Sequence, residues 1–344
     1  MKDKIIYNTK MFICIILFIN IFNLLFGKTN SLVGVTVVVA ALVLMEKDLT
    51  KEASKNFSKL LFINLILGFF TFFAGNNIFI GIILNFLALG AIGYFLSYNL
   101  NKSIVVPFGL QYLFMLYTPV YGVDFIKRIV GLVFGAIAIM AMQFVIHFKD
   151  NKNDKPNEEE KLSDGEDKDI EYKVIKIFKK EFSVNTIRFN YAIRIGLLAA
   201  LTGFLIDFFK LEQGRWMAYT VFSLTELYAE NCKSRARERL EGTVIGALIV
   251  IISFIFIKDS SIRLIIVLLA GYLNPFAHNY KEAMICVTVS VIASVSLNSG
   301  VIEVTMKRLM YVGIGIIFSL LANKFILYTT KESYETLNLN ENVL

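Results

Sequence analysis

Long apolar runs separated by short charged blocks are the feature that most constrains this chain. We mark twelve such runs, six in each half, and several are shorter than the roughly 20 residues that a helical membrane crossing needs. The pattern predicts an all-α integral membrane protein with about twelve transmembrane helices, some of them broken or re-entrant. The runs fall at 8–26, 30–45, 57–74, 78–98, 103–122 and 125–148, and then at 190–209, 215–230, 241–257, 262–277, 283–299 and 306–328.

The composition agrees with a membrane protein and argues against other classes. Charged residues make up 18% of the chain, whereas soluble domains carry about a quarter. The net charge of +7 comes from lysines and arginines in the expected loops, where they orient membrane helices, so we expect no nucleic-acid partner. The sequence has no phosphate-binding glycine loop, HExxH motif or paired-cysteine site, which predicts neither an enzyme nor a cofactor or metal.

The two sets of runs match each other in register, which predicts an internal repeat. A shift of 184 residues superposes acidic and basic positions in the two halves, and a shift of 180 superposes a later Lys–Arg pair and a glycine. Two six-helix repeats in parallel orientation would place both termini on one side of the membrane. That side holds most of the lysines and arginines, so we expect it to be the cytoplasmic side of the inner membrane. The matched pairs are Thr36 with Thr220, Glu46 with Glu230, Lys51 with Arg235, Lys55 with Arg239, Lys127–Arg128 with Lys307–Arg308, and Gly135 with Gly315.

This repeat divides the chain into five predicted parts. The first repeat is expected over 1–148 and the second over 188–328, followed by a short cytoplasmic tail at 329–344. Residues 149–169 are strongly acidic and contain no aromatic residue, which predicts a disordered linker. Apolar residues recur at helical spacing among lysines over 170–187, which predicts an amphipathic helix on the membrane surface; a soluble helix packed on a partner is the alternative.

The stretch from Gln213 to Gly246 carries the candidate site residues. A helix over 215–230 would place Trp216, Thr220, Glu226 and Glu230 on one face, and a basic loop at 231–241 would follow it. Arg235 and Arg239 are spaced at i and i+4, so each can present a guanidinium fork that holds a carboxylate with two hydrogen bonds. We therefore expect both to bind an anionic substrate; the alternative is that this loop only anchors the helices.

Five other residues are candidates for the same path. Trp216 is either an anchor at the membrane interface or a surface that stacks on a planar substrate, and Thr220 would line the path. Glu226 and Glu230 are candidates for proton coupling because acids are costly inside a membrane, although Glu230 could simply be solvated or paired with Arg235. Arg194 is a candidate substrate-binding residue and partner for Glu226, or it extends its side chain to the interface.

Small residues predict a close helix–helix contact directly after the basic cluster. Gly242 and Gly246 are four residues apart, with Thr243 beside the first, and this small-xxx-small spacing lets a second helix approach closely. Packing is the role that we expect for all three residues, and Thr243 could bond its own helix backbone.

The pattern from Trp216 through Gly246 resembles the fusaric acid resistance and aromatic acid exporter superfamily, to which the aluminium-activated malate transporters are distantly similar. Its specific part is Arg239-Leu240-Glu241-Gly242-Thr243 followed by Gly246, and the resemblance covers about 188–328. In the first half the basic positions are lysines and Ser58 replaces the glycine. The resemblance implies six-helix membrane units, paired in one chain or by dimerisation, that move organic anions out of the cell.

We therefore expect an inner-membrane transporter that exports organic acid anions, aromatic ones included, in exchange for protons. The alternatives are a passive organic-anion channel and a membrane scaffold for envelope assembly that transports nothing. The expected partners are membrane lipid, a small organic anion and, if the units also pair between chains, a second copy of this chain.

Overall fold

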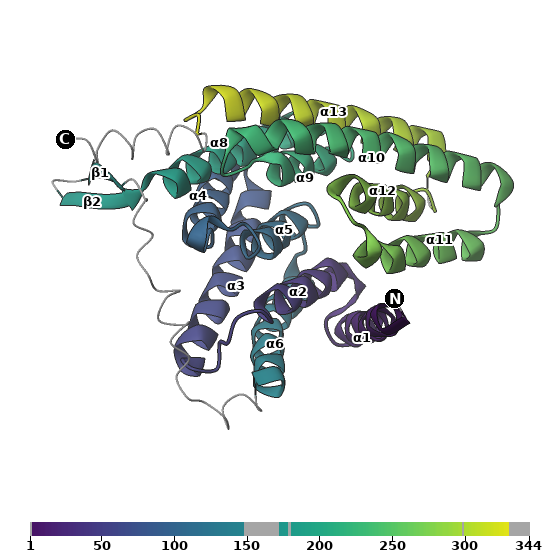
Figure 1. Ribbon diagram of the computed structural model, residues 1–344, viewed down its shortest axis with the longest axis horizontal. Coiled ribbons are helices and arrows are strands. Elements are labelled where there is room, and N and C mark those ends of the chain that lie inside the picture. The colour runs from purple at the N-terminus through teal and green to yellow at the C-terminus, as the bar shows by residue number, and fades with distance from the viewer. Residues whose placement is uncertain (1, 148–171, 178–179, 298, 330–344) are drawn as a thin grey trace. The chain divides into compact units, whose positions relative to one another are not determined.

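The computed structural model describes residues 2–147, 172–177, 180–297 and 299–329 (Figure 1). By contacts the chain divides into two compact units. One unit contains Leu201–Tyr328 together with the residues up to Leu17, and the other contains Phe18–Ala200 together with Thr329. The predicted linker at 149–169 and nearly all of the predicted tail lie outside the described residues.

Each of the twelve apolar runs corresponds to one helix. The described part of the chain is almost wholly helical, as expected where a backbone must satisfy its own hydrogen bonds in lipid. The helices are α1 (Lys2–Phe26), α2 (Ser31–Leu44), α3 (Ala53–Asn76), α4 (Ile78–Phe95), α5 (Val105–Leu116), α6 (Gly122–His147), α8 (Thr186–Phe208), α9 (Arg215–Leu224), α10 (Ala229–Phe256), α11 (Ser260–Leu273), α12 (Tyr280–Val295) and α13 (Val301–Phe325).

Seven of the helices in the described residues are long and apolar enough to cross a membrane. They are α1, α3, α4, α6, α8, α10 and α13, while α2, α5 and α11 are apolar but shorter. On α10 the large apolar residues Leu240, Val244 and Leu248 are exposed, which is the pattern expected of a face against lipid rather than water. The chain is a multi-pass membrane protein, and the number of crossings stays a prediction.

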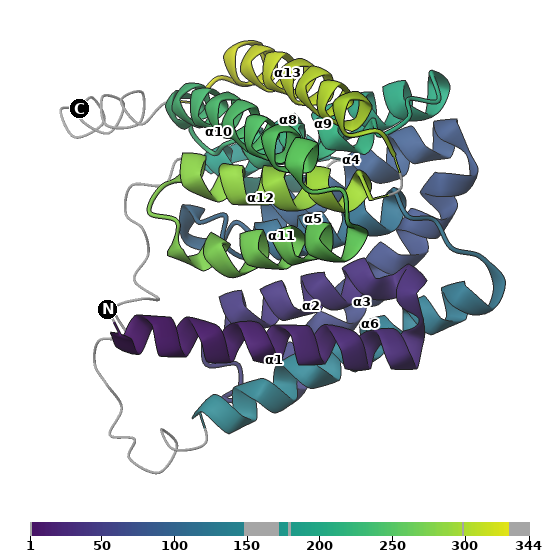
Figure 2. The same ribbon diagram turned by 90° about the vertical axis from the view of Figure 1, so that its right-hand side faces the viewer.

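In the unit that contains Leu201–Tyr328, α10 is the central helix. It packs against α12 on one side and α13 on the other, and α12 in turn packs against α11. Figure 2 shows α12 between α10 and α11. The short helix α9 packs along α13, and Gly315 of α13 makes this contact close: a Cβ there would lie 2.8 Å from Thr220 Cβ and 3.0 Å from the Met217 carbonyl oxygen.

In the unit that contains Phe18–Ala200, the corresponding pairs of helices pack together. Here α3 packs against α5 and α6, α2 against α6, and α4 against α5. Buried amides help to hold this unit: the Gln111 amide donates to Asn64 Oδ1 at 3.1 Å, and Tyr112 donates to Asn85 Oδ1 at 2.7 Å. These pairs have counterparts in the other unit, whereas the packing of α3 on α4 and of α2 on α5 has no comparable counterpart there, so the repeat stays a prediction.

The segment expected to form an amphipathic helix is instead a β-hairpin. Strand β1 (Tyr172–Ile177) pairs antiparallel with β2 (Lys180–Asn185), with Val174 opposite Ser183. The prediction used apolar residues at helical spacing, but β1 is also rich in β-branched residues, which favour strands. Among the described residues of this segment, Thr186 and Ile187 alone are helical, and they begin α8.

Candidate functional site

The helix predicted over 215–230 is broken before the acidic residues of its stripe. α9 ends at Leu224, residues 225–228 are not helical, and α10 begins at Ala229. Asn323 of α13 holds this break, since its side chain donates to the Ser319 carbonyl oxygen and accepts from the Glu226 backbone N–H at 3.5 Å. At 1.5 Å per residue α9 spans about 15 Å, roughly half of a 30 Å hydrocarbon core. Because α10 begins at Ala229, the basic cluster at 231–241 lies in a helix and not in the predicted loop.

Arg239 lies at the centre of a buried polar cluster formed by α9, α10 and α12. Its Nη1 donates to Tyr280 Oη at 2.9 Å and to Ser223 Oγ at 3.2 Å, and its Nη2 donates to Thr220 Oγ1 at 3.3 Å. The residue is 5% exposed, and its Nε is buried without a hydrogen-bond partner. Among the described residues no carboxylate lies within 4.0 Å of this guanidinium, and the groups that accept from it, Ser223, Tyr280, Met284 and Thr220, are all neutral.

Arg235 lies beside the same cluster but is neutralised by an acid. Its Nε is 3.1 Å from Glu226 Oε1, and its guanidinium lies 4.4 Å from the centre of the Tyr280 ring. Because the carboxylate oxygen does not lie along the N–H direction, the contact is an ion pair and not a hydrogen bond. The side chain of Glu226 is 6% exposed and that of Arg235 is 38% exposed. The two predicted arginines therefore differ, since only Arg239 lacks an acidic neighbour.

Trp216 is buried and faces a cation of α13. It is 2% exposed, and Arg308 of α13 places its guanidinium carbon 5.3 Å from the centre of the indole ring. Arg308 is itself 3% exposed. Sequence reasoning missed this buried arginine, although the register match of Lys127–Arg128 with Lys307–Arg308 was a signal that could have found it.

Trp216 and Thr220 are joined along one face of α9. The Thr220 hydroxyl donates to the Trp216 carbonyl oxygen at 2.8 Å and accepts from Arg239. Arg308 therefore reaches α9 from α13 at Trp216, and Arg239 reaches the same helix from α10 one turn later. Together with Tyr280 of α12, the site therefore unites residues from four helices, α9, α10, α12 and α13.

The glycines after the basic cluster form the contact between α10 and α12. A Cβ at Gly242 would lie 2.7 Å from the Lys281 carbonyl oxygen, and one at Gly246 would lie 2.8 Å from Thr288 Cβ. The Thr243 hydroxyl donates to the Arg239 carbonyl oxygen of its own helix at 2.7 Å. This close approach brings Tyr280, at the start of α12, to Arg239.

The remaining candidates lie elsewhere. Glu230 is exposed in the first turn of α10, where a negative charge is favourable next to the helix N-terminus. Arg237 is exposed and pairs with Glu241, one turn along, at 2.8 Å. Arg194 is fully buried in the part of α8 that belongs to the unit with Phe18–Ala200, and its role stays a prediction.

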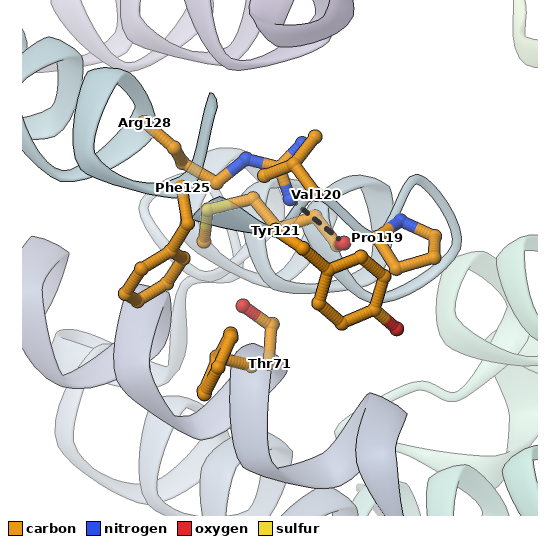
Figure 3. A pocket seen from close by; sticks show the side chains of 8 residues that line it. Thr71, Pro119, Val120, Tyr121, Phe125 and Arg128 are labelled. Carbon is orange, nitrogen blue, oxygen red and sulfur yellow. Dashed lines mark hydrogen bonds between the residues drawn. The ribbon is translucent and has the colours of Figure 1, made fainter. Parts of the chain in front are cut away.

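A pocket in the unit with Phe18–Ala200 contains the arginine that the repeat matches with Arg308. It encloses about 230 Å³ including its open mouth, and Arg128 forms one wall (Figure 3). This guanidinium donates to Asn30 Oδ1 at 2.8 Å and to the carbonyl oxygens of Met115 and Thr118 at 3.1 and 2.7 Å. These carbonyls belong to the C-terminal end of α5, where a cation is favourable. The pocket is lined by Thr71, Phe72, Met115, Pro119, Val120, Tyr121, Phe125 and Arg128.

The fold and the buried polar cluster define a helical membrane protein with an uncompensated cationic centre. Residues 198–322 match the protein family described as fusaric acid resistance protein-like, which confirms the resemblance for the second half of the chain. The family suggests a membrane transporter or exporter and not an enzyme. Comparisons with curated proteins and with solved structures found no match.

Proposed function

We propose that this protein exports small organic acid anions, including aromatic ones, across the inner membrane, with both of its termini in the cytoplasm. The observation that supports the anion most directly is Arg239, a buried guanidinium with no acid beside it among the described residues and a free Nε–H. Keeping an unpaired charge out of water costs several kcal/mol. A carboxylate that accepts from Arg239 removes that cost during its passage.

The other groups of the site fit an anion that passes and does not stay. Ser223, Thr220 and Tyr280 hold the Arg239 side chain through neutral oxygens, so the guanidinium keeps its full charge. The short helix α9 and the break after it agree with transporters whose discontinuous helices border the substrate path. Arg235 is not assigned to the substrate in the resting state because Glu226 already pairs with it.

The test is uptake of radiolabelled benzoate, 4-hydroxybenzoate and succinate into inverted membrane vesicles under an imposed pH gradient. We expect the wild type to take up at least one of them and Arg239→Gln to lose about tenfold or more, since hydrogen bonds to charged groups contribute about 1.5–3 kcal/mol each. Arg237→Gln is the matched control, because the same substitution on the same helix removes only an exposed charge paired with Glu241.

The outcome separates the three hypotheses. Equal uptake by the wild type and Arg239→Gln removes the arginine from the mechanism. Uptake of none of the three acids by vesicles that contain the wild-type protein contradicts the transport proposal and favours the assembly scaffold. Anion currents across planar bilayers without any pH gradient, at rates that no carrier reaches, identify a channel that uses the same residues.

A further inference from the structure

Arg308 is the buried cation of this unit that the proposed function has not used. It is 3% exposed, and within the described part of the chain its guanidinium donates no hydrogen bond and meets no carboxylate. Its Nε is buried without a partner, and its one specific contact is the face of Trp216 at 5.3 Å. Buried arginines normally use several of their five N–H donors, so this side chain lacks acceptors that a ligand would supply.

Arg239 is placed to share that ligand. Arg308 lies over Trp216, Arg239 donates to Thr220, and these two residues are one turn apart on α9, a rise of about 6 Å. The charge of Arg239 also acts on Arg308 through space. Two cations of the same sign, facing one turn of a helix with unused N–H groups, form a site for the oxygens of an anion.

The corresponding arginine of the first half is already satisfied. Arg128 is as deeply buried as Arg308, but it donates to Asn30 and to the carbonyl oxygens of Met115 and Thr118 at the end of α5. Its guanidinium nitrogens therefore already donate hydrogen bonds to groups near the end of α5. The matched positions therefore differ in chemistry. Arg128 donates hydrogen bonds within its own unit, whereas the Nε–H of Arg308 has no acceptor.

We propose that Arg308 is a second anion-binding residue, which completes the site with Arg239, and that the chain has one such site and not two. The carboxylate of the ligand accepts from both guanidiniums next to α9. Trp216 holds Arg308 through a cation–π contact. The proposal rests on the function proposed for Arg239, but it adds a residue and a stoichiometry that this function does not require.

The test is ligand-induced thermal stabilisation of the purified full-length protein in detergent, titrated separately with benzoate, 4-hydroxybenzoate and succinate. We expect stabilisation of the wild type by at least one of them, and a Kd raised about tenfold or more in Arg308→Gln. Arg308→Lys keeps the charge but not the fork, so it is the second variant if the glutamine protein does not fold. Arg128→Lys is the matched control, and we expect it to melt at a lower temperature with a Kd within about twofold of the wild type.

The outcomes distinguish the two proposals. If Arg239→Gln weakens binding and both Arg308 variants bind as tightly as the wild type, the second arginine is wrong and the proposed function stands. If Arg128→Lys weakens binding as much as Arg308→Lys does, the single-site assignment is wrong. If no carboxylate stabilises the wild type, the inference and the proposed function both fail.

Discussion

At the scale of single residues, the site depends on which charges are compensated. Arg235 and Arg239 are spaced for the same helix face, yet Glu226 pairs with the first, whereas the second donates to neutral groups alone. The difference arises because α9 ends at Leu224, which frees the backbone around Glu226 to place that carboxylate next to Arg235. A buried acid paired with a half-exposed arginine is also where a proton could act, since protonation would break the ion pair.

We predict that Glu226→Gln, which mimics a permanently protonated acid, uncouples transport from the pH gradient. The part of the uptake that responds to the gradient should disappear, whereas exchange of anions without a gradient should continue. Glu230→Gln is the control because Glu230 is exposed in the first turn of α10. Uptake by Glu226→Gln that still responds fully to the gradient would remove Glu226 from the coupling.

At the scale of helices, α10 has two different faces. One carries Arg239, Gly242 and Gly246 toward the neighbouring helices, and the other exposes apolar residues such as Val244 and Leu248. The small residues allow α12 to approach closely enough for Tyr280 to reach Arg239. The packing of two helices therefore determines the geometry of the site.

We predict that Gly246→Ala and Gly313→Ala change stability in opposite directions. The added Cβ at Gly246 would lie 2.8 Å from Thr288 Cβ and 2.9 Å from the Ile285 carbonyl oxygen, whereas nothing lies within 4 Å of one at Gly313. Overpacking costs about 1–3 kcal/mol, while alanine in an open helical position gains up to about 1 kcal/mol over glycine. Thermal unfolding in detergent measures both, and a loss of stability at Gly313 equal to that at Gly246 would contradict the packing account.

The sequence predicted the helices well because their positions follow from one physical requirement. In lipid, every backbone N–H and C=O needs a partner within its own segment, so apolar runs become helices wherever they occur. The break at 225–228 was missed because Leu224 before it and Leu227 within it are apolar, so a hydropathy pattern runs through it without a gap. The hairpin at 172–185 was missed because valine and isoleucine among lysines fit a strand as well as a helix.

The site was predicted only in part, since charge alone does not reveal burial. Arg239 was singled out by its spacing, and the structure gives it a buried position. Arg128 and Arg308 entered the prediction only as matched positions of the two halves and not as residues of the site. Their burial depends on acceptors and on an indole ring contributed by other helices, Met115 for the first and Trp216 for the second, which no local pattern contains.

At the scale of the whole molecule, similar sequence positions in the two halves have different roles. Lysines stand in the first half where the second half has Arg235 and Arg239, and the buried arginine of the first half holds the end of α5. A chain with two such halves would therefore bind its anion in the second half alone.

Equilibrium binding of the preferred carboxylate to the purified protein, measured by isothermal titration calorimetry on the wild type, Arg239→Gln and Arg237→Gln, tests this account most directly. We predict one anion per chain for the wild type and for Arg237→Gln, and a loss of about tenfold or more in affinity for Arg239→Gln in a protein that remains folded. Two anions per chain, or unchanged binding by Arg239→Gln, would contradict it.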